Sequence, residues 1–282
     1  TLTKIDKPTI DQYIDSLRER LEEGDLSSAT TADRVSALNT TLQYMGKDGL
    51  TVSAKEKGLS RGSVDTSDKS NTREAAAAVT GAMFDRGQND TKHMGLYHST
   101  ILQEAFNLRA RESFGIKIIE KDPDAPKLII DKGDLPKNGR PREIPIRNDH
   151  QRQVLREARE FAKSQGWRSL IPPEYSLTEW KNFAYSALNE IREAVGHSKF
   201  HFHGERHYYA HGRFQGLWQE KTGEGLQCPA VMGLGIREWR GYAFNATGLS
   251  MDQIKEIDKE IRLEISEELG HSRTDVTRYY LG

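Results

Sequence analysis

The chain has 282 residues, of which 35% are hydrophobic and 29% are charged, and its formal net charge is −1. These values are typical of a helix-rich globular protein and exclude a chain that is disordered throughout. Neither a run of eighteen apolar residues nor an apolar core near the N-terminus occurs, so neither a membrane span nor a secretory signal is expected. The single Cys228 cannot form an internal disulfide, which favours a reducing, cytoplasmic location.

The N-terminal part of the chain predicts a small helical domain. Apolar residues recur at helical spacing over residues 8–22 and 33–46. Residues 58–71 are mostly Gly, Ser, Asp and other polar residues, a composition typical of a linker. We therefore predict a helical domain over residues 1–68 and a larger domain over residues 73–282.

The larger domain combines predicted helices with a few short strands. Helices are predicted over residues 74–84, 96–107, 149–165, 176–195, from about 203 onward, and 250–268. Short strands are predicted over residues 114–119, 127–131 and 143–146. Asn138-Gly139 predicts a tight turn between the last two strands. The predicted fold is mainly α with a small antiparallel β-sheet, an α+β class.

Charge is unevenly distributed along the chain. Residues 132–147 carry five basic and two acidic side chains, a local excess of positive charge. Residues 250–268 carry three basic and seven acidic side chains, and we expect this face to point away from any polyanion. The overall charge therefore does not exclude a nucleic-acid partner, although such proteins usually show a basic footprint.

Four segments, in order along the chain, carry residue types suited to attack on a phosphodiester. They are Asn107-Leu108-Arg109-Ala110-Arg111-Glu112, Pro136-Lys137-Asn138-Gly139-Arg140, His203-Gly204-Glu205-Arg206-His207 and Leu269-Gly270-His271, the last followed by Tyr279-Tyr280. Arginine forks match phosphate oxygens in bidentate geometry, and tyrosine can serve as a covalent nucleophile. His203 and Arg206 are one helical turn apart, so both can face one phosphate.

These segments resemble those of the tyrosine recombinases, the phage-integrase family of DNA strand-exchange enzymes. Arg109 matches the family's first arginine, with Asn107 where the family has glycine, and Lys137 matches the lysine of its β-hairpin. His203-x-x-Arg206 resembles the second box, and Leu269-Gly-His271 resembles the third. The nucleophilic tyrosine of the family follows this last histidine by nine residues, which selects Tyr280.

The resemblance implies an N-terminal core-binding domain and a C-terminal catalytic domain that clasp duplex DNA. Tyr280 would attack the scissile phosphate and form a 3′-phosphotyrosyl bond. Arg109 and Arg206 would stabilise charge on the non-bridging oxygens, and His271 would add a hydrogen bond to the same phosphate.

Proton transfer is implied for two further residues. His203 would act as a base or a positioning donor, and Lys137 would protonate the leaving 5′-oxygen. Arg140 and Arg142 would hold the strand pair against the DNA. Neither a metal ion nor a nucleotide cofactor is needed, because the covalent link preserves the energy of the phosphodiester.

Alternatives stay open at several positions. Arg111 can replace Arg109 if the register is wrong by two, and Lys132 competes with Lys137. Tyr279 is the competing hydroxyl beside Tyr280. A metal site is a rival interpretation, because histidines 203, 207 and 211 share one helix face.

Two departures from the family pattern are clear. Glu205 stands where the family usually has a hydrophobic residue. Arg206 and His271 are 65 positions apart, and the excess, roughly residues 212–252, resembles a divergent branch of integrases from mobile elements.

The expected partner is a double-stranded DNA attachment site, bound by a homotetramer on synapsed DNA. The free protein is expected to be a monomer or dimer, and accessory DNA-bending proteins are candidate further partners. The expected location is the cytoplasm, in association with the nucleoid, for a protein of bacterial, phage or mobile-element origin. A type IB topoisomerase and a catalytically idle DNA-binding regulator are the alternatives.

Overall fold

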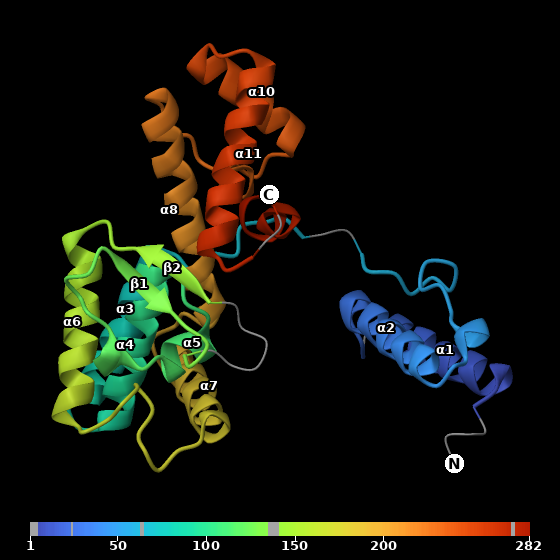
Figure 1. Ribbon diagram of the computed structural model, residues 1–282, viewed down its shortest axis with the longest axis horizontal. Helices are drawn as coiled ribbons and strands as arrows, with labels where there is room; N and C mark the ends of the chain where they lie inside the picture. The colour runs from blue at the N-terminus through green and yellow to red at the C-terminus, as the bar shows by residue number, and fades with distance from the viewer. Residues whose placement is uncertain (1–4, 24, 63–64, 135–140, 272–273) are drawn as a thin grey trace. The chain divides into compact units, whose positions relative to one another are not determined.

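The computed structural model describes residues 5–23, 25–62, 65–134, 141–271 and 274–282 (Figure 1). Helices make up 65% of the described residues, and the described strands form one two-stranded antiparallel sheet, which gives an α+β protein. The chain divides into two compact units, residues 1–65 and 66–282. The division falls within the predicted linker, and the second unit includes residues 66–68, which the sequence places with the first domain.

The first unit is a helical hairpin with a small apolar core. Its elements are α1 (Lys7–Glu22), α2 (Ser28–Tyr44) and the short 3-10 helix η2 (Asp48–Leu50). Asp6 and Ser27 begin the two long helices, because their side chains accept hydrogen bonds from backbone N–H groups that have no partner within the helix. Leu59 is fully buried in this core, so the predicted linker contributes part of its length to the first unit.

The second unit contains all the remaining elements. They are α3 (Arg73–Gly87), α4 (Thr91–Phe106), α5 (Ala110–Gly115), η3 (Ile118–Glu120), β1 (Lys127–Ile130), β2 (Arg142–Pro145), α6 (Asp149–Ser164), α7 (Leu177–Ala194), α8 (Phe202–Thr222), α9 (Pro229–Met232), α10 (Ile236–Thr247), α11 (Met251–Glu268), η4 (Thr274–Thr277) and α12 (Arg278–Leu281).

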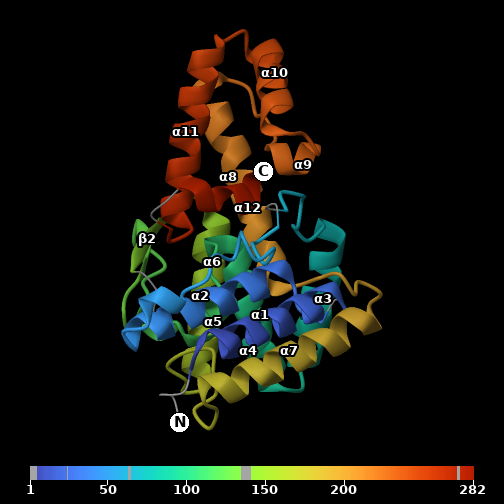
Figure 2. The same cartoon turned by 90° about the vertical axis from the view of Figure 1, so that its right-hand side faces the viewer.

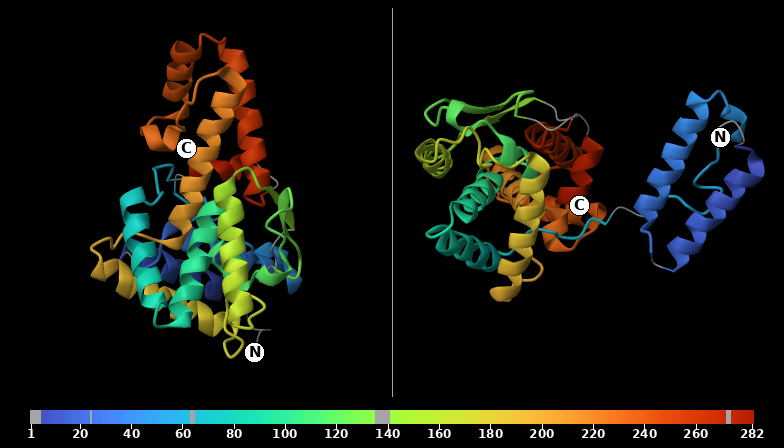
Figure 3. Two further views of the ribbon diagram at one scale, coloured as in Figure 1. Left: turned by 90° about the vertical axis from the view of Figure 1, so that its left-hand side faces the viewer. Right: turned by 90° about the horizontal axis from the view of Figure 1, so that it is seen from below.

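Helices α3, α4 and α6 run side by side, with α4 between the other two (Figure 3, left). The two strands pair antiparallel, with Leu128 opposite Ile144 and Ile130 opposite Arg142. Because side chains alternate between the two faces of a strand, Leu128, Ile130 and Ile144 all enter the core that α4 and α6 also line. This core fixes the position of β2, whose first residue reaches the candidate site.

The predicted strand over residues 114–119 is wrong. The region forms α5 and η3 instead. The Glu112 carboxylate accepts a hydrogen bond from the Arg109 backbone N–H at 2.8 Å and so begins a helix there. A short apolar run fits a buried helix as well as a strand, and periodicity alone does not separate the two.

The segment expected to be an insertion, residues 212–252, is helical and packs into a core that it shares with α11 and α12. It includes the end of α8, then α9, α10 and the first residues of α11. Figure 2 shows α10 beside α11, and α9 near the C-terminal end of the chain. Trp218 and Trp239 are fully buried and their rings lie 5.4 Å apart, in a cluster that also contains Tyr280 and Leu281. Across the parts of the chain that the structure describes, every helix is too short or too polar to span a bilayer.

Candidate active site

Arg109 lies at the junction between α4 and α5. Helix α4 ends at Asn107, whose φ of 56° lies in the left-handed region that favours glycine and, next to it, asparagine. Asparagine is tolerated at this position because it adopts the left-handed conformation more readily than other residues with a side chain. The Arg109 side chain is about one-third exposed, and its Nη1 donates to Glu112 at 2.7 Å. The alternative, Arg111, is exposed and forms neither a hydrogen bond nor an ion pair within the described residues.

Glu112 and Arg142 form a buried brace under Arg109. Arg142 donates two parallel hydrogen bonds to the Glu112 carboxylate, at 3.1 and 2.8 Å, and its Nε donates to the Glu268 carbonyl at 3.1 Å. Burial opposes ionisation of Glu112, but the hydrogen bonds and charge of Arg142, together with Arg109, lower its pKa to about 2. The expected role of Arg142 against DNA is therefore wrong, because its guanidinium points into the protein.

Arg206 connects three separate segments of the second unit. It is completely buried in α8. Its Nη1 donates to the Asn107 carbonyl, its Nη2 to the Leu269 carbonyl, and its Nε to the Tyr280 hydroxyl at 3.1 Å. Arg109 Nη2 donates to the same Leu269 carbonyl at 3.3 Å. One oxygen atom thus accepts from both guanidinium groups, which places the two forks side by side.

Tyr280 lies among three histidines of the site region. Its ring centroid is 4.7 Å from that of His207, 5.5 Å from that of His203 and 6.3 Å from that of His271. Tyr280 is 5% exposed, whereas Tyr279 is 41% exposed and makes no described contact with this group. Of the two neighbouring hydroxyls, the structure therefore brings that of Tyr280 to the arginines.

Low pKa values keep the site histidines neutral near pH 7. Packing of the His203 ring on Tyr280 and His207, together with the positive charge of Arg206, lowers its pKa to about 4. Burial and the charges of Arg206 and Arg109 likewise lower the pKa of His271 to about 4. The Nε2 atom of His271 is buried without a hydrogen-bond partner among the described residues. Such an atom is free to bind an incoming polar group.

The two lysine candidates have different outcomes. Lys137 lies outside the described residues, as do its neighbours in the predicted turn. Lys132 is exposed, just beyond β1. The structure thus brings together Arg109, His203, Arg206, His271 and Tyr280 of the six predicted residues.

Several residues around the site carry no recognisable sequence signal for their contacts. Glu205, expected as a departure from the motif, is buried and bonded to the Asn71 amide at 2.7 Å and to Arg73 at 3.1 Å. Asn71 also holds the His201 backbone at both its N–H and its carbonyl. Its amide fills the space beside Gly204, where an added Cβ would lie 2.3 Å from Asn71 Oδ1. This contact anchors the first turn of α8.

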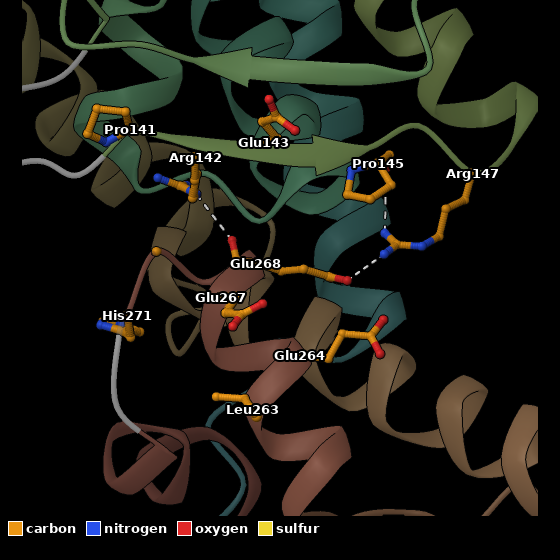
Figure 4. Close-up of a pocket in the computed structure, with 11 residues that line it drawn as sticks. Pro141, Arg142, Glu143, Pro145, Arg147, Leu263, Glu264, Glu267, Glu268 and His271 are labelled. Atoms are coloured by element: carbon orange, nitrogen blue, oxygen red, sulfur yellow. Dashed lines mark hydrogen bonds and ion pairs between the residues drawn. The ribbon is translucent and has the colours of Figure 1, made fainter.

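A groove of about 630 Å³ opens beside the site, between β2 and the end of α11 (Figure 4). His271 lies at its edge, and Figure 4 shows Arg142 and Arg147 both directed toward Glu268. Four glutamates line the groove against these two arginines. This excess of negative charge makes the groove a poor path for DNA phosphates.

The metal-site alternative receives no support. Histidines 203, 207 and 211 do share one face of α8, with ring centroids 5.1 and 6.1 Å apart in succession. Within the described ranges, however, no group of three or more histidine, cysteine or acidic residues is arranged to hold a metal ion.

Comparison with protein-family models, with curated proteins and with solved structures finds no match for this chain. Its function must therefore be argued from the geometry of the site itself.

Proposed function

We propose that this chain is a tyrosine site-specific recombinase or integrase, which cleaves and rejoins duplex DNA through a 3′-phosphotyrosyl intermediate. The observation that carries the proposal is the contact of Arg206 Nε with the Tyr280 hydroxyl at 3.1 Å, beside a carbonyl that Arg206 shares with Arg109. A tyrosine oxygen and two adjacent guanidinium forks are the parts that attack on a phosphodiester requires.

The chemical step follows from these groups. The phenol oxygen of Tyr280 attacks the scissile phosphorus as its proton leaves, and the P–O5′ bond breaks. His203, whose ring centroid lies 5.5 Å from that of Tyr280 and which is neutral near pH 7, is the proposed acceptor of that proton. Arg109 and Arg206 stabilise the negative charge on the non-bridging oxygens, and the unpartnered Nε2 of His271 is available to the same phosphate. Lys137 supplies the proton to the leaving 5′-oxygen.

The described site is a closed form that must open for DNA. Arg206 is fully buried, and its guanidinium lies 5.7 Å from the centroid of the Tyr280 ring. A phosphate oxygen cannot reach a fully covered guanidinium unless a covering group moves. The proposed opening step is rotation of the Tyr280 side chain, which breaks the contact between its hydroxyl and Arg206 Nε.

The proposed partners are a double-stranded attachment site and three further copies of the chain on synapsed DNA, in the cytoplasm. A second exchange completes the reaction, because a 5′-hydroxyl from the partner strand attacks the phosphotyrosyl bond and releases Tyr280. Atoms and charge balance over the two exchanges, so the proposed cycle consumes no energy source.

The test is covalent trapping on nicked duplexes of randomised sequence. Cleavage near a nick releases a short strand, which prevents religation and leaves the protein attached to DNA. Denaturing electrophoresis then recovers the adduct, and sequencing of the attached DNA identifies the target. Adducts with the wild type and none with Tyr280→Phe are expected.

The same experiment separates the alternatives. DNA binding without any adduct would overturn the enzyme and favour the idle regulator. Adducts accompanied by relaxation of a supercoiled plasmid, but without exchange between two duplexes, would favour a topoisomerase.

A further inference from the structure

The last residues of the chain are held by their backbone as well as by the Tyr280 hydroxyl. We define residues 278–282 as the tyrosine segment. The Tyr280 carbonyl accepts a hydrogen bond from His211 Nε2 at 2.7 Å, and the Gly282 carbonyl accepts one from Arg262 Nη1 at 2.9 Å. Two carbonyls, at Tyr280 itself and two residues beyond, are therefore fixed to α8 and α11.

His211 is held in place for this contact by its burial in α8. It lies two turns beyond His203. A carbonyl only accepts hydrogen bonds, so Nε2 must carry the hydrogen. The opposite ring atom, Nδ1, lies 3.7 Å from the Asp68 carboxylate, in the segment that leads into α3.

Arg262 is oriented by a carboxylate. Its Nε donates to Asp258 at 2.7 Å, one turn earlier on α11, and both side chains are buried. Asp258 also lies 3.7 Å from Arg240 of α10. A buried guanidinium held by a carboxylate loses little freedom when it binds a further acceptor, so the position of Nη1 is set in advance.

The excess segment between Arg206 and His271 supplies the surface beneath the tyrosine segment. Gly282 has a φ of 81°, and an added Cβ would lie 2.8 Å from the Ala230 nitrogen of α9. Leu281 is fully buried in the cluster that contains Trp218 and Trp239. Helices α9 and α10 thus complete a dock that neither α8 nor α11 could form alone.

We infer that His211 and Arg262 are positioning residues that clamp the backbone of the tyrosine segment, and that residues 223–250 build the dock on which this clamp works. The consequence of this clamp for catalysis rests on the proposed function. With the backbone fixed, exchange between the closed site and the reactive site needs only rotation of the Tyr280 side chain. The hydroxyl then returns to the same place in every cycle.

The test compares His211→Leu and Arg262→Met, which remove a donor, with His211→Gln and Arg262→Lys, which keep one. Lys259→Met is the matched control, because Lys259 is exposed on α11 and pairs only with Glu256 at 3.3 Å. Two quantities are measured: hydrogen exchange of the amides of residues 276–282 in the free protein, and single-turnover cleavage with DNA affinity.

Exchange of these amides should rise tenfold or more in the two donor-free variants and stay unchanged in the control. Cleavage should fall roughly tenfold to a hundredfold, as expected for a misplaced nucleophile, while DNA affinity changes less than twofold. His211→Gln should recover much of the loss. A merely structural role would not give this separation of rate from affinity.

The outcomes distinguish the dock from the proposed function. Unchanged exchange in both donor-free variants overturns the dock, whether or not the enzyme cleaves DNA. If amide exchange increases in the donor-free variants but the wild type never forms a DNA adduct, the dock is supported and the proposed function is overturned. If a donor-free variant also unfolds α8 and α11, the test uses His211→Gln and Arg262→Lys instead. Amide exchange equal to that of the wild type in both of these variants, together with cleavage reduced a hundredfold, would overturn the clamp.

Discussion

Arg206 and Tyr280 are 74 positions apart in the sequence, yet the Arg206 Nε donates a hydrogen bond to the Tyr280 hydroxyl at 3.1 Å. Burial lowers the pKa of Arg206 to about 10, so the guanidinium is charged at neutral pH. The contact therefore covers the arginine in the closed site and holds the Tyr280 oxygen beside it.

Tyr280→Phe should abolish covalent DNA adducts, because it removes only the attacking oxygen. DNA affinity should stay within a few-fold of the wild type, and this is measured by fluorescence anisotropy on an uncleaved duplex. Tyr279→Phe is the matched control and should form adducts normally, since Tyr279 is exposed and lies outside the described site. An adduct peptide that carries DNA on Tyr279 would show that Tyr279, and not Tyr280, is the nucleophile.

Arg109→Ala should slow single-turnover cleavage by two or more orders of magnitude, the usual cost of removing one oxyanion donor. Arg206→Ala should cost at least as much, and it should also lower thermal stability because the Asn107 carbonyl loses its side-chain donor and the Leu269 carbonyl keeps only Arg109. Lysine replacements should recover little, since a point charge does not reproduce a bidentate fork. Near-normal cleavage by Arg109→Ala would remove Arg109 from the proposed mechanism.

Helices with a strong apolar period were predictable, while a short apolar run without a clear period was not. The predicted helix over residues 149–165 agrees with α6, because its side-chain cap and its apolar stripe act within a few residues. The region 114–119 was predicted wrongly because its helix begins with a hydrogen bond between Arg109 and Glu112. The apolar run that follows has no period that separates helix from strand.

In the candidate site, the resemblance to the recombinase motifs selected Arg206 and Tyr280, which the structure brings together. No local pattern could indicate that Arg142 turns inward onto Glu112, 30 positions away, or that His211 binds the Tyr280 carbonyl. These contacts arise from packing of β2 and α8 against segments that are distant in sequence.

The brace between Glu112 and Arg142 should give the second unit a distinct acid sensitivity. The pKa of Glu112 is lowered from 4.5 to about 2 in the folded protein, so its contribution to stability is complete above about pH 4.5. This contribution, roughly 3 kcal/mol, is lost as the pH falls toward 2. Stability therefore rises with pH across this window.

Glu112→Gln should lower the free energy of unfolding by roughly 3–5 kcal/mol at pH 7, because it leaves the Arg142 charge buried without its partner. Urea unfolding from pH 7 down to pH 3 measures the difference from the wild type, which should narrow below about pH 4.5. Glu143→Gln on the exposed face of β2 is the matched control and should change stability by less than about 1 kcal/mol. A difference that stays constant with pH would show that Glu112 is not the titrating group.

Lys137→Ala tests the general-acid assignment with two substrates that differ in one atom. On an ordinary phosphodiester the leaving 5′-oxygen needs a proton, so the variant should be severely slow. On a 5′-bridging phosphorothiolate the leaving group is a thiolate, which departs without protonation, so cleavage should be largely restored. Lys132→Ala, which changes an exposed lysine just beyond β1, should show a mild defect on both substrates.

The two lysine variants are compared in single-turnover assays at matched DNA saturation, so that weaker binding does not appear as slower chemistry. Equal defects of Lys137→Ala on both substrates would mean that this lysine binds phosphate and transfers no proton. Restoration of the Lys132 variant alone would assign the acid to the position five residues earlier. Restoration of the Lys137 variant alone would identify Lys137 as the proton donor, because only the loss of an acid is compensated by a better leaving group.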